Sequence, residues 1–236
     1  MTKRFFITGA NSGFGFAIAK AAVAQGHSVI GAVRSDAALS HVRAELPAVQ
    51  PVRLDVTDFD NIPNVIAQAE DDFGPIDVLI NNAGIGVPGA ADQISTDLLH
   101  AHIDINLTAP MRLSAAAARA MKARNDGQIF SIVSLAGLFP LKDSAAYSAS
   151  KFGLRGFMAA LSLELRPFGV KVGGLYPNAI DTPMLREEMA NPAGSPLNFA
   201  GNANPLSPAE TSLVVMKALE TGKLETWLPS MDGHMA

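Results

Sequence analysis

The chain has no cysteine, few charged residues and no long apolar run, and each absence excludes a class of protein. Without cysteine there is neither a disulfide framework nor a thiolate metal site. No stretch approaches the roughly 20 apolar residues of a membrane-spanning helix. Met1–Ile7 copies the charged start of a signal peptide, but its apolar run stops at Gly9. These features predict a cytoplasmic protein with no membrane partner.

The charge balance and the histidines narrow the range of partners further. The formal net charge is -4, and an acidic balance argues against nucleic acid or an acidic membrane surface as partner. His100 and His102 are two positions apart in a stretch expected to be helical, so they point to different faces. We therefore expect no metal site.

What the chain does contain is enough apolar sequence for one large core. Hydrophobic residues make up 48% of the 236 residues, a length that fits a single α/β domain. Alanine supplies much of this fraction in the helical stretches, which points to close helix packing. The long apolar helices predict a homodimer or a homotetramer.

The beginning of the chain has the pattern of a nucleotide-binding unit. Residues 5–8 read as a short buried strand, Gly9–Gly15 as a glycine-rich turn, and 16–25 as a helix that ends at Gly26. Free backbone amides and the helix dipole make such a turn an anion site, and glycine lets the backbone approach a pyrophosphate. Glycines in a turn are a weak signal when they stand alone.

The end of the second expected strand, residues 28–33, predicts which cofactor binds. An acidic residue here binds the adenosine ribose and repels a 2′-phosphate, whereas this chain has Arg34 followed by Ser35. A guanidinium in this place pairs with a phosphate, which favours NADP over NAD. Two alternatives stay open. Asp36 takes the ribose if the loop shifts slightly, and Arg34 can be an ordinary solvated arginine.

Two further expected strands end in polar residues. Residues 49–54 run into Asp55 and Val56, where the carboxylate is placed to accept the adenine amino group. Residues 78–80 run into Asn81–Gly84. This polar quartet suits a position along the cofactor, although a plain turn explains it equally well.

The second half continues the alternation of elements. We expect helices over 95–124 and 143–166 and strands over 128–133, 171–175 and 225–228. Asn106 lies inside the first helix, where asparagine is a mediocre residue because its side chain competes for backbone hydrogen bonds. Ser134 follows a strand at the edge where α/β sheets bind ligands. The apolar loop Leu135–Leu141 is a natural wall for an apolar substrate.

Tyr147 and Lys151 are four residues apart, so they share one helix face and reach a common ligand. A free tyrosine has a pKa of ~10, and a nearby cation lowers it. Bringing the pKa to ~7 needs about 4 kcal/mol of differential stabilisation, which one or two close charges supply. A proton donor of this kind suits the interconversion of alcohol and carbonyl. The spacing alone also fits an ordinary helix pair.

Together these motifs resemble the short-chain dehydrogenase/reductase family. Thr8–Gly15 matches its TGxxxGxG motif, and Asn81–Gly84 matches its NNAG motif. The order and spacing of the family's catalytic tetrad are matched by Asn106, Ser134, Tyr147 and Lys151. The resemblance implies one α/β domain of the Rossmann type, with a doubly wound, mostly parallel sheet of about seven strands between two helical layers. It further implies that 1–94 mainly bind the dinucleotide, 95–181 form the catalytic half and 182–207 form a substrate lid.

The resemblance also implies a role for each residue of the tetrad. Tyr147 would be the general acid for reduction and the base for oxidation, and Ser134 would hydrogen-bond the substrate oxygen. Lys151 would lower the Tyr147 pKa, helped by the oxidised nicotinamide, and bind its ribose. Asn106 would hold a water that links Lys151 to solvent. The residues implied to bind the cofactor are Gly9, Asn11, Ser12, Gly13, Phe14, Gly15, Arg34, Ser35, Asp55, Val56, Asn82, Ala83, Gly84, Tyr147, Lys151, Pro177, Ile180 and Thr182.

The chain departs from the family pattern after the sixth expected strand, where Pro177 is followed by Asn178 in place of glycine. Asparagine tolerates left-handed backbone, so we expect the turn to persist. The Pro-, Gly- and Asn-rich segment 182–208 fits the lid, and Ser207 begins a helix. Tyr176 has no cationic partner one helical turn away and is expected to be an inert control.

The substrate class is inferred from the expected pocket walls, which are apolar and offer no arginine for a carboxylate. These walls are Val87, Leu135, Leu138, Phe139, Met184, Met189 and Phe199. The sequence therefore predicts an NADP(H)-dependent oxidoreductase for a moderately hydrophobic ketone, aldehyde or secondary alcohol. An NAD-linked alcohol dehydrogenase and a non-catalytic dinucleotide-sensing regulator remain as alternatives.

Overall fold

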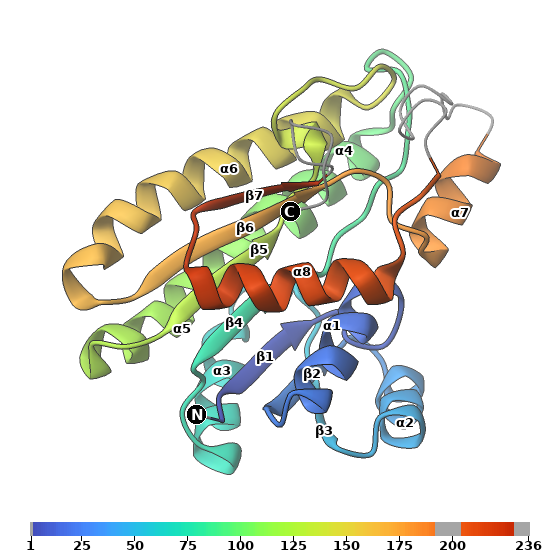
Figure 1. Cartoon of the computed structure of the whole chain (residues 1–236). Coiled ribbons are helices and arrows are strands. Elements are labelled where there is room, and N and C mark those ends of the chain that lie inside the picture. Colours follow the sequence, from blue (N-terminus) through green and yellow to red (C-terminus); the bar gives the residue numbers. More distant parts are fainter. Residues whose placement is uncertain (1, 192–203, 229–236) are drawn as a thin grey trace.

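A computed structural model describes residues 2–191 and 204–228 of the chain. In these ranges, seven parallel strands form one sheet in the order β3-β2-β1-β4-β5-β6-β7 (Figure 1). The strands are β1 (Arg4–Thr8), β2 (Ser28–Val33), β3 (Val49–Arg53), β4 (Val78–Asn81), β5 (Gln128–Ile132), β6 (Lys171–Pro177) and β7 (Glu225–Leu228). The predicted single-domain, doubly wound sheet is confirmed.

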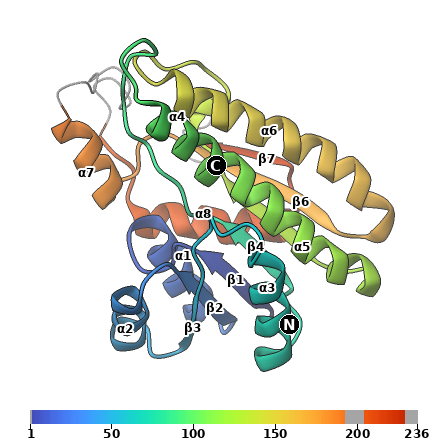
Figure 2. The same cartoon turned by 180° about the vertical axis from the view of Figure 1, so that it is seen from behind.

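Helices cover both faces of the sheet (Figures 1 and 2). One face carries α1 (Gly13–Ala24), α2 (Asp36–Glu45) and α8 (Pro208–Thr221). The other face carries α3 (Ile62–Phe73), α4 (Thr96–Ile103), α5 (Ala109–Arg124) and α6 (Ala145–Leu165). The short α7 (Pro183–Ala190) lies beyond the carboxyl end of the sheet, and single 3-10 turns cover Leu135–Gly137 and Arg166–Phe168.

The strands alternate their side chains between two cores. Phe5 and Ile7 of β1 pack with the helices of the first face, and Phe6 between them packs with those of the second. This follows from the two-residue period of a strand, which makes every residue of a covered parallel strand apolar. Each such side chain stabilises the fold by about 1.5–3 kcal/mol when fully buried.

The site is positioned where the order of strands reverses, between β1 and β4. The Thr8 hydroxyl accepts hydrogen bonds from the backbone N–H groups of Asn82 and Ala83, both at 3.0 Å. The Asn82 side chain donates to the Thr8 carbonyl at 2.9 Å. These bonds hold the two glycine-ended motifs side by side at the carboxyl edge, where open α/β sheets bind ligands.

Three local features differ from the sequence prediction. The expected long helix 95–124 is divided by a π-helical segment, Asp104–Thr108, within which the Asn106 side chain bonds a neighbouring loop. Helix α2 was not predicted, and the Ser35 hydroxyl caps it by accepting from the Ala38 N–H at 3.2 Å. The expected lid contains helix α7, and its residues 192–203 lie outside the described ranges.

The described residues contain neither a membrane-spanning helix nor a metal-binding cluster. None of the helices there is long and apolar enough to cross a membrane. Nor do those residues contain a group of three or more His, Asp or Glu side chains that could hold a metal ion. The helix that starts after Ser207 is present as predicted, with the serine side chain accepting from the Glu210 N–H at 3.4 Å.

Candidate active site

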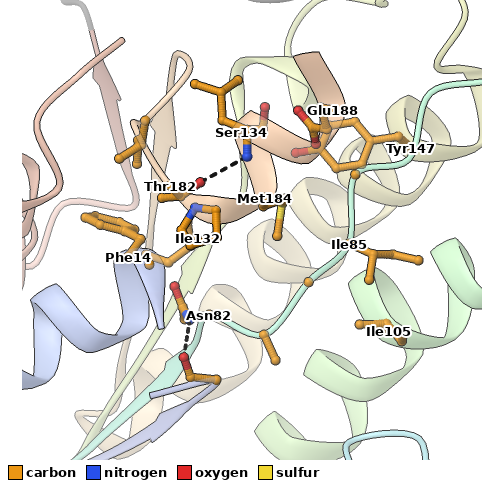
Figure 3. Close-up of a pocket in the computed structure, with 18 of the residues that line it drawn as sticks. Phe14, Asn82, Ile85, Ile105, Ile132, Ser134, Tyr147, Thr182, Met184 and Glu188 are labelled. Atoms are coloured by element: carbon orange, nitrogen blue, oxygen red, sulfur yellow. Dashed lines mark hydrogen bonds between the residues drawn. The ribbon is translucent and has the colours of Figure 1, made fainter. Parts of the chain in front are cut away.

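A cavity of about 950 Å³ runs along the carboxyl edge of the sheet (Figure 3). It extends from the glycine-rich turn and Arg34 to Tyr147 and Glu188. The predicted site residues that line it are Gly9, Asn11, Ser12, Gly13, Phe14, Arg34, Ser35, Asp55, Val56, Asn82, Ala83, Gly84, Ser134, Tyr147, Lys151, Pro177, Ile180 and Thr182. The other two, Gly15 and Asn106, lie behind its wall.

The glycine-rich turn fits a dinucleotide pyrophosphate. Gly9 and Gly13 have φ angles of +68° and +53°, which L side chains rarely adopt. Ser12 caps α1 through its backbone only, with no hydrogen bond from its side chain to the first turn. The amides of that turn therefore stay available for an anion, which the helix dipole also favours. Gly15 lies behind the turn, where a methyl group would overlap the Gly9 carbonyl.

The far end of the cavity offers a cation and a hydrogen-bonded carboxylate. Arg34 is exposed beside the start of α2, and its charge helps to lower the pKa of Asp55. Burial pushes that pKa upward, but the hydrogen bonds from Thr57 and the Arg34 charge outweigh it. Asp36, the alternative ribose ligand, pairs with Arg53 at 3.2 Å. The carboxylate that would have favoured NAD is thus engaged elsewhere.

Ser134 and Tyr147 both line the inner end of the cavity. The Ser134 backbone has φ 153° and ψ 159°, a conformation rare for residues other than glycine, just after β5. Its hydroxyl accepts from the Ala136 N–H at 3.1 Å. Burial raises the pKa of Tyr147 to about 12, although the nearby Ser134 hydroxyl works in the opposite direction.

Lys151 lies below the Tyr147 ring, with its Nζ 5.6 Å from the ring centroid. It is buried, and its ammonium donates to the Ile132 carbonyl at 3.1 Å. Burial lowers the pKa of Lys151 to about 8. The sequence predicted that Lys151 lowers the pKa of Tyr147, but the protein alone raises that pKa, because burial of the phenol dominates.

Asn106 lies behind the cavity wall and holds the loop that follows β4. Its side chain bonds both backbone groups of Ile85 and donates to the Ser150 hydroxyl at 3.2 Å. A methyl group on Gly84 would come within 3.1 Å of the Asn106 oxygen, so the loop and the helix are in close contact. Asn106 is therefore a positioning residue in this structure.

His102 was not predicted to belong to the site. It is fully buried in α4, its Nδ1 donates to the Leu98 carbonyl at 2.9 Å, and its Nε2 accepts from the Val87 N–H at 3.2 Å. Its ring meets the Tyr147 ring edge-on at 6.2 Å between centroids. Burial lowers its pKa, which keeps it neutral. No sequence pattern indicates this role, since it depends on a tertiary contact with the loop after β4.

Glu188 was also missed, because its segment was read as an apolar lid. It lines the cavity close to Tyr147 (Figure 3). Among the predicted apolar walls, Val87, Leu135, Phe139 and Met184 line the cavity. The predictions for Leu138 and Met189 are wrong, because Leu138 packs on the core and Met189 points to solvent, while Phe199 lies outside the described residues.

One expectation about β6 was wrong, and the residue after β6 has an ordinary backbone conformation. Tyr176 does have a cationic neighbour, since the Arg155 guanidinium lies 5.9 Å from its ring centroid. Its hydroxyl donates to Glu225 at 3.2 Å, and burial raises its pKa. Asn178 avoids the left-handed conformation, and its side chain accepts from the Ala179 N–H at 2.8 Å.

Comparison with known proteins identifies the family. The family model described as short chain dehydrogenase matches residues 3–193. Oxidoreductase BOA17 of Botryotinia fuckeliana is 35% identical over 83% of this chain and 72% of its own length. The 3-dehydrosphinganine reductase TSC10B of Arabidopsis thaliana is 32% identical, over 94% of this chain and 68% of its own.

A solved structure agrees with these matches. The crystal structure of a short-chain dehydrogenase from Streptomyces avermitilis has a TM-score of 0.86 and 32% sequence identity, covering 97% of this chain and 88% of that one. The chain belongs to the short-chain dehydrogenase/reductase family, whose members are oxidoreductases that act on CH–OH groups with NAD(P).

Proposed function

We propose that the protein is an NADP(H)-dependent oxidoreductase that interconverts a carbonyl and a secondary alcohol on a moderately hydrophobic substrate. The observation that carries this proposal is that Ser134, Tyr147 and Lys151 line one cavity together with the glycine-rich turn. The arrangement gives a proton donor, an oxygen-binding hydroxyl and a cation at one end of a dinucleotide-sized groove.

The chain's own residues handle the proton and the developing charge. In the direction of reduction, Tyr147 gives its hydroxyl proton to the carbonyl oxygen, and Ser134 donates a hydrogen bond that stabilises the charge on it. A reduced nicotinamide, when bound, supplies the hydride. Lys151 has a pKa near 8, which makes its ammonium a suitable source of the proton that restores Tyr147. Oxidation of the alcohol reverses these transfers.

The preference for NADP is supported by the charges at the start of α2. Arg34 is exposed and lines the cavity, while Asp36 does not line it and pairs with Arg53. A guanidinium at the end of β2 favours an additional phosphate through charge-assisted hydrogen bonds. We assign 1–94 mainly to dinucleotide binding, 95–181 to catalysis and 182–207 to a substrate lid.

A homodimer or homotetramer is supported by apolar side chains on the outer helices. Those exposed on α4, α5 and α6 are Leu99, Met111, Phe152 and Leu163. Exposed apolar side chains grouped on neighbouring helices are typical of protein interfaces.

The proposal is tested by a panel of ketones, aldehydes and secondary alcohols, each run with NADPH or NADP⁺ and with NADH or NAD⁺. Turnover, read as the absorbance of the reduced nicotinamide, is expected with the phosphorylated cofactor at a kcat/KM at least tenfold higher than with the other. A higher kcat/KM with NADH would instead make it an NAD-linked dehydrogenase. Binding of NADPH without turnover of any compound would support a dinucleotide-sensing regulator.

A further inference from the structure

Helix α7 points one carboxylate into the substrate end of the cavity. The Thr182 hydroxyl caps the helix by accepting from the Leu185 N–H at 3.3 Å, and Leu185 is buried. On the opposite side, Arg186 pairs with Asp181 at 3.0 Å in solvent. Glu188 lies one turn after Leu185, at nearly the same angle around the helix, so its side chain also points inward.

The Glu188 carboxylate lies against Tyr147 and the loop after β4. A methyl group built on Gly86 would collide with the Glu188 oxygen, and the same methyl would lie 3.6 Å from Cε2 of Tyr147. Figure 3 shows the carboxylate beside the Tyr147 ring, on the side that faces the cavity. The absence of a side chain at Gly86 is thus what makes room for Glu188.

This carboxylate has no partner among the described residues. Neither of its oxygens forms a hydrogen bond or an ion pair within 2–191 and 204–228, and Lys151 influences it only through space. Burial raises the pKa of Glu188 to about 7, and the Lys151 charge counteracts this only in part. A partly buried carboxylate is costly unless it is paired, so its position favours a ligand that brings a positive charge.

We propose that Glu188 binds a protonated amine on the substrate, next to the carbonyl that Tyr147 and Ser134 hold. The inference rests on the proposed function and narrows its substrate class to amino ketones and the corresponding amino alcohols. Because Glu188 lies against the Tyr147 ring, the amine belongs on a carbon close to the reacting carbon. Of the charged groups near Glu188, Lys151 acts on it through space and donates to the Ile132 carbonyl. Carboxylate-bearing substrates are correspondingly repelled.

The test compares three ketones of the same chain length that differ at the carbon beside the carbonyl: an aminomethyl, a hydroxymethyl and a carboxymethyl ketone. At pH 7.5 the wild-type protein with NADPH is expected to give the highest kcat/KM for the aminomethyl ketone and the lowest for the carboxymethyl ketone. In Glu188→Gln the preference for aminomethyl over hydroxymethyl ketone should fall by roughly 10- to 100-fold, as expected for loss of a charged hydrogen bond. The preference is a ratio measured within each protein, so an effect of the substitution on the pKa values of Tyr147 and Lys151 is common to both ketones.

Glu187→Gln is the matched control, because it removes the same charge from the neighbouring residue, which borders the same cavity but is exposed. It should leave the substrate ratio unchanged. A ratio unaffected by Glu188→Gln, or a wild-type protein that prefers the hydroxymethyl ketone, would overturn the inference and leave the proposed function intact. Tighter NADPH binding by Glu188→Gln without a change in the ratio would also overturn it, since the carboxylate would then only compete with the cofactor.

A binding measurement separates this inference from the proposed function. Titration calorimetry with the aminomethyl and hydroxymethyl alcohols is performed on the wild-type protein and Glu188→Gln, each with NADPH present, because a reduced cofactor cannot accept a hydride from an alcohol. The amino alcohol should bind at least tenfold more tightly to the wild-type protein, and that advantage should disappear in the variant. If no ketone is turned over, the proposed catalytic function fails while this titration still decides whether Glu188 recognises the amine.

Discussion

The Asn106 side chain bonds both backbone groups of Ile85. Its oxygen accepts from the Ile85 N–H at 2.9 Å, and its nitrogen donates to the Ile85 carbonyl at 2.8 Å. The second amide proton goes to the Ser150 hydroxyl. The π-helical turn around Asn106 makes this reach possible, because it moves the side chain out of the regular helix register. With both amide protons used, we propose that a water beside Lys151 is held by backbone oxygens instead.

Replacing Asn106 should therefore disturb the loop and not only proton transfer. Asn106→Ala leaves two buried backbone groups of Ile85 unpaired, which we expect to cost about 1–3 kcal/mol of unfolding free energy. Urea unfolding measures this loss, and kcat should fall in parallel as Gly84 and its neighbours move. The exposed Asn64→Ala on α3 is the control and should stay within about 0.5 kcal/mol. An Asn106→Ala protein of unchanged stability would show that Asn106 does not hold the loop at Ile85.

Tyr147→Phe removes the proposed proton donor and keeps the ring. We expect kcat to fall by roughly 10²–10⁴-fold, the usual contribution of a general acid or base. NADPH affinity, followed by fluorescence, should change little, because the substitution affects only the hydroxyl. Tyr176→Phe removes a hydroxyl outside the cavity and should preserve kcat while losing the bond to Glu225. Wild-type turnover in Tyr147→Phe would exclude its assigned role.

Arg34→Gln should discriminate between the two cofactors. Loss of a charged hydrogen bond to a phosphate costs about 1.5–3 kcal/mol, so the Kd for NADPH should rise by roughly 10- to 100-fold. The Kd for NADH should remain within about twofold, since that cofactor has no 2′-phosphate. Arg43→Gln, also exposed but farther along α2, is the control. Equal losses of affinity for both cofactors would show that Arg34 binds the adenosine half of either cofactor and does not recognise the 2′-phosphate.

The parts of the site that the sequence predicted are those whose chemistry is local. A glycine-rich turn between strand and helix requires only neighbouring residues, and the Tyr147–Lys151 spacing follows from helix geometry alone. His102, by contrast, acquires its role through the Val87 N–H on another element, and Arg155 reaches Tyr176 across two elements. The periodicity of the sequence does not indicate contacts between residues on different elements.

Glu188 illustrates the same limit inside the expected lid. The segment was read from its Pro and Gly content, which predicts irregular backbone but not the short helix α7 or the direction of its side chains. An expected apolar wall thus contains a carboxylate. The burial that raises the Tyr147 pKa in the chain without cofactor is a tertiary feature of the same kind, since the cation was visible in the sequence and the burial was not.

Gly15→Ala tests how closely the two motifs pack. A methyl group there would overlap the Gly9 carbonyl and the Asn82 side chain, so the turn must open. We expect NADPH affinity to fall by more than tenfold and the melting temperature to fall with it. Gly156→Ala on α6 is the matched control, because nothing lies within 4 Å of its added methyl. That variant should gain up to about 1 kcal/mol from helix propensity, and similar behaviour of the two variants would contradict the close packing.

Burial of the Lys151 ammonium should lower the free energy of unfolding of the cofactor-free protein. Its pKa falls from 10.5 to about 8 on folding, because burial disfavours the ammonium. Below pH 8 both states are protonated and the folded state carries the full penalty. Between pH 8 and 10.5 the unfolded chain holds a proton that the folded protein lacks, so the free energy of unfolding rises with pH in this window.

Lys151→Met removes the buried charge, so the difference in unfolding free energy between this variant and the wild-type protein should depend on pH. At pH 7 we expect the free energy of unfolding of the variant to exceed that of the wild-type protein by about 1–3 kcal/mol. Removing the buried charge contributes ~1.4 kcal/mol for each unit of pKa shift, and the lost hydrogen bond to Ile132 subtracts from this gain. The advantage should shrink as the pH rises toward 10.5, while turnover is lost at every pH. Urea unfolding at pH 7 and pH 10 measures the difference, with the exposed Lys20→Met as control. A variant less stable at pH 7, or an advantage independent of pH, would show that the lysine is not penalised by burial.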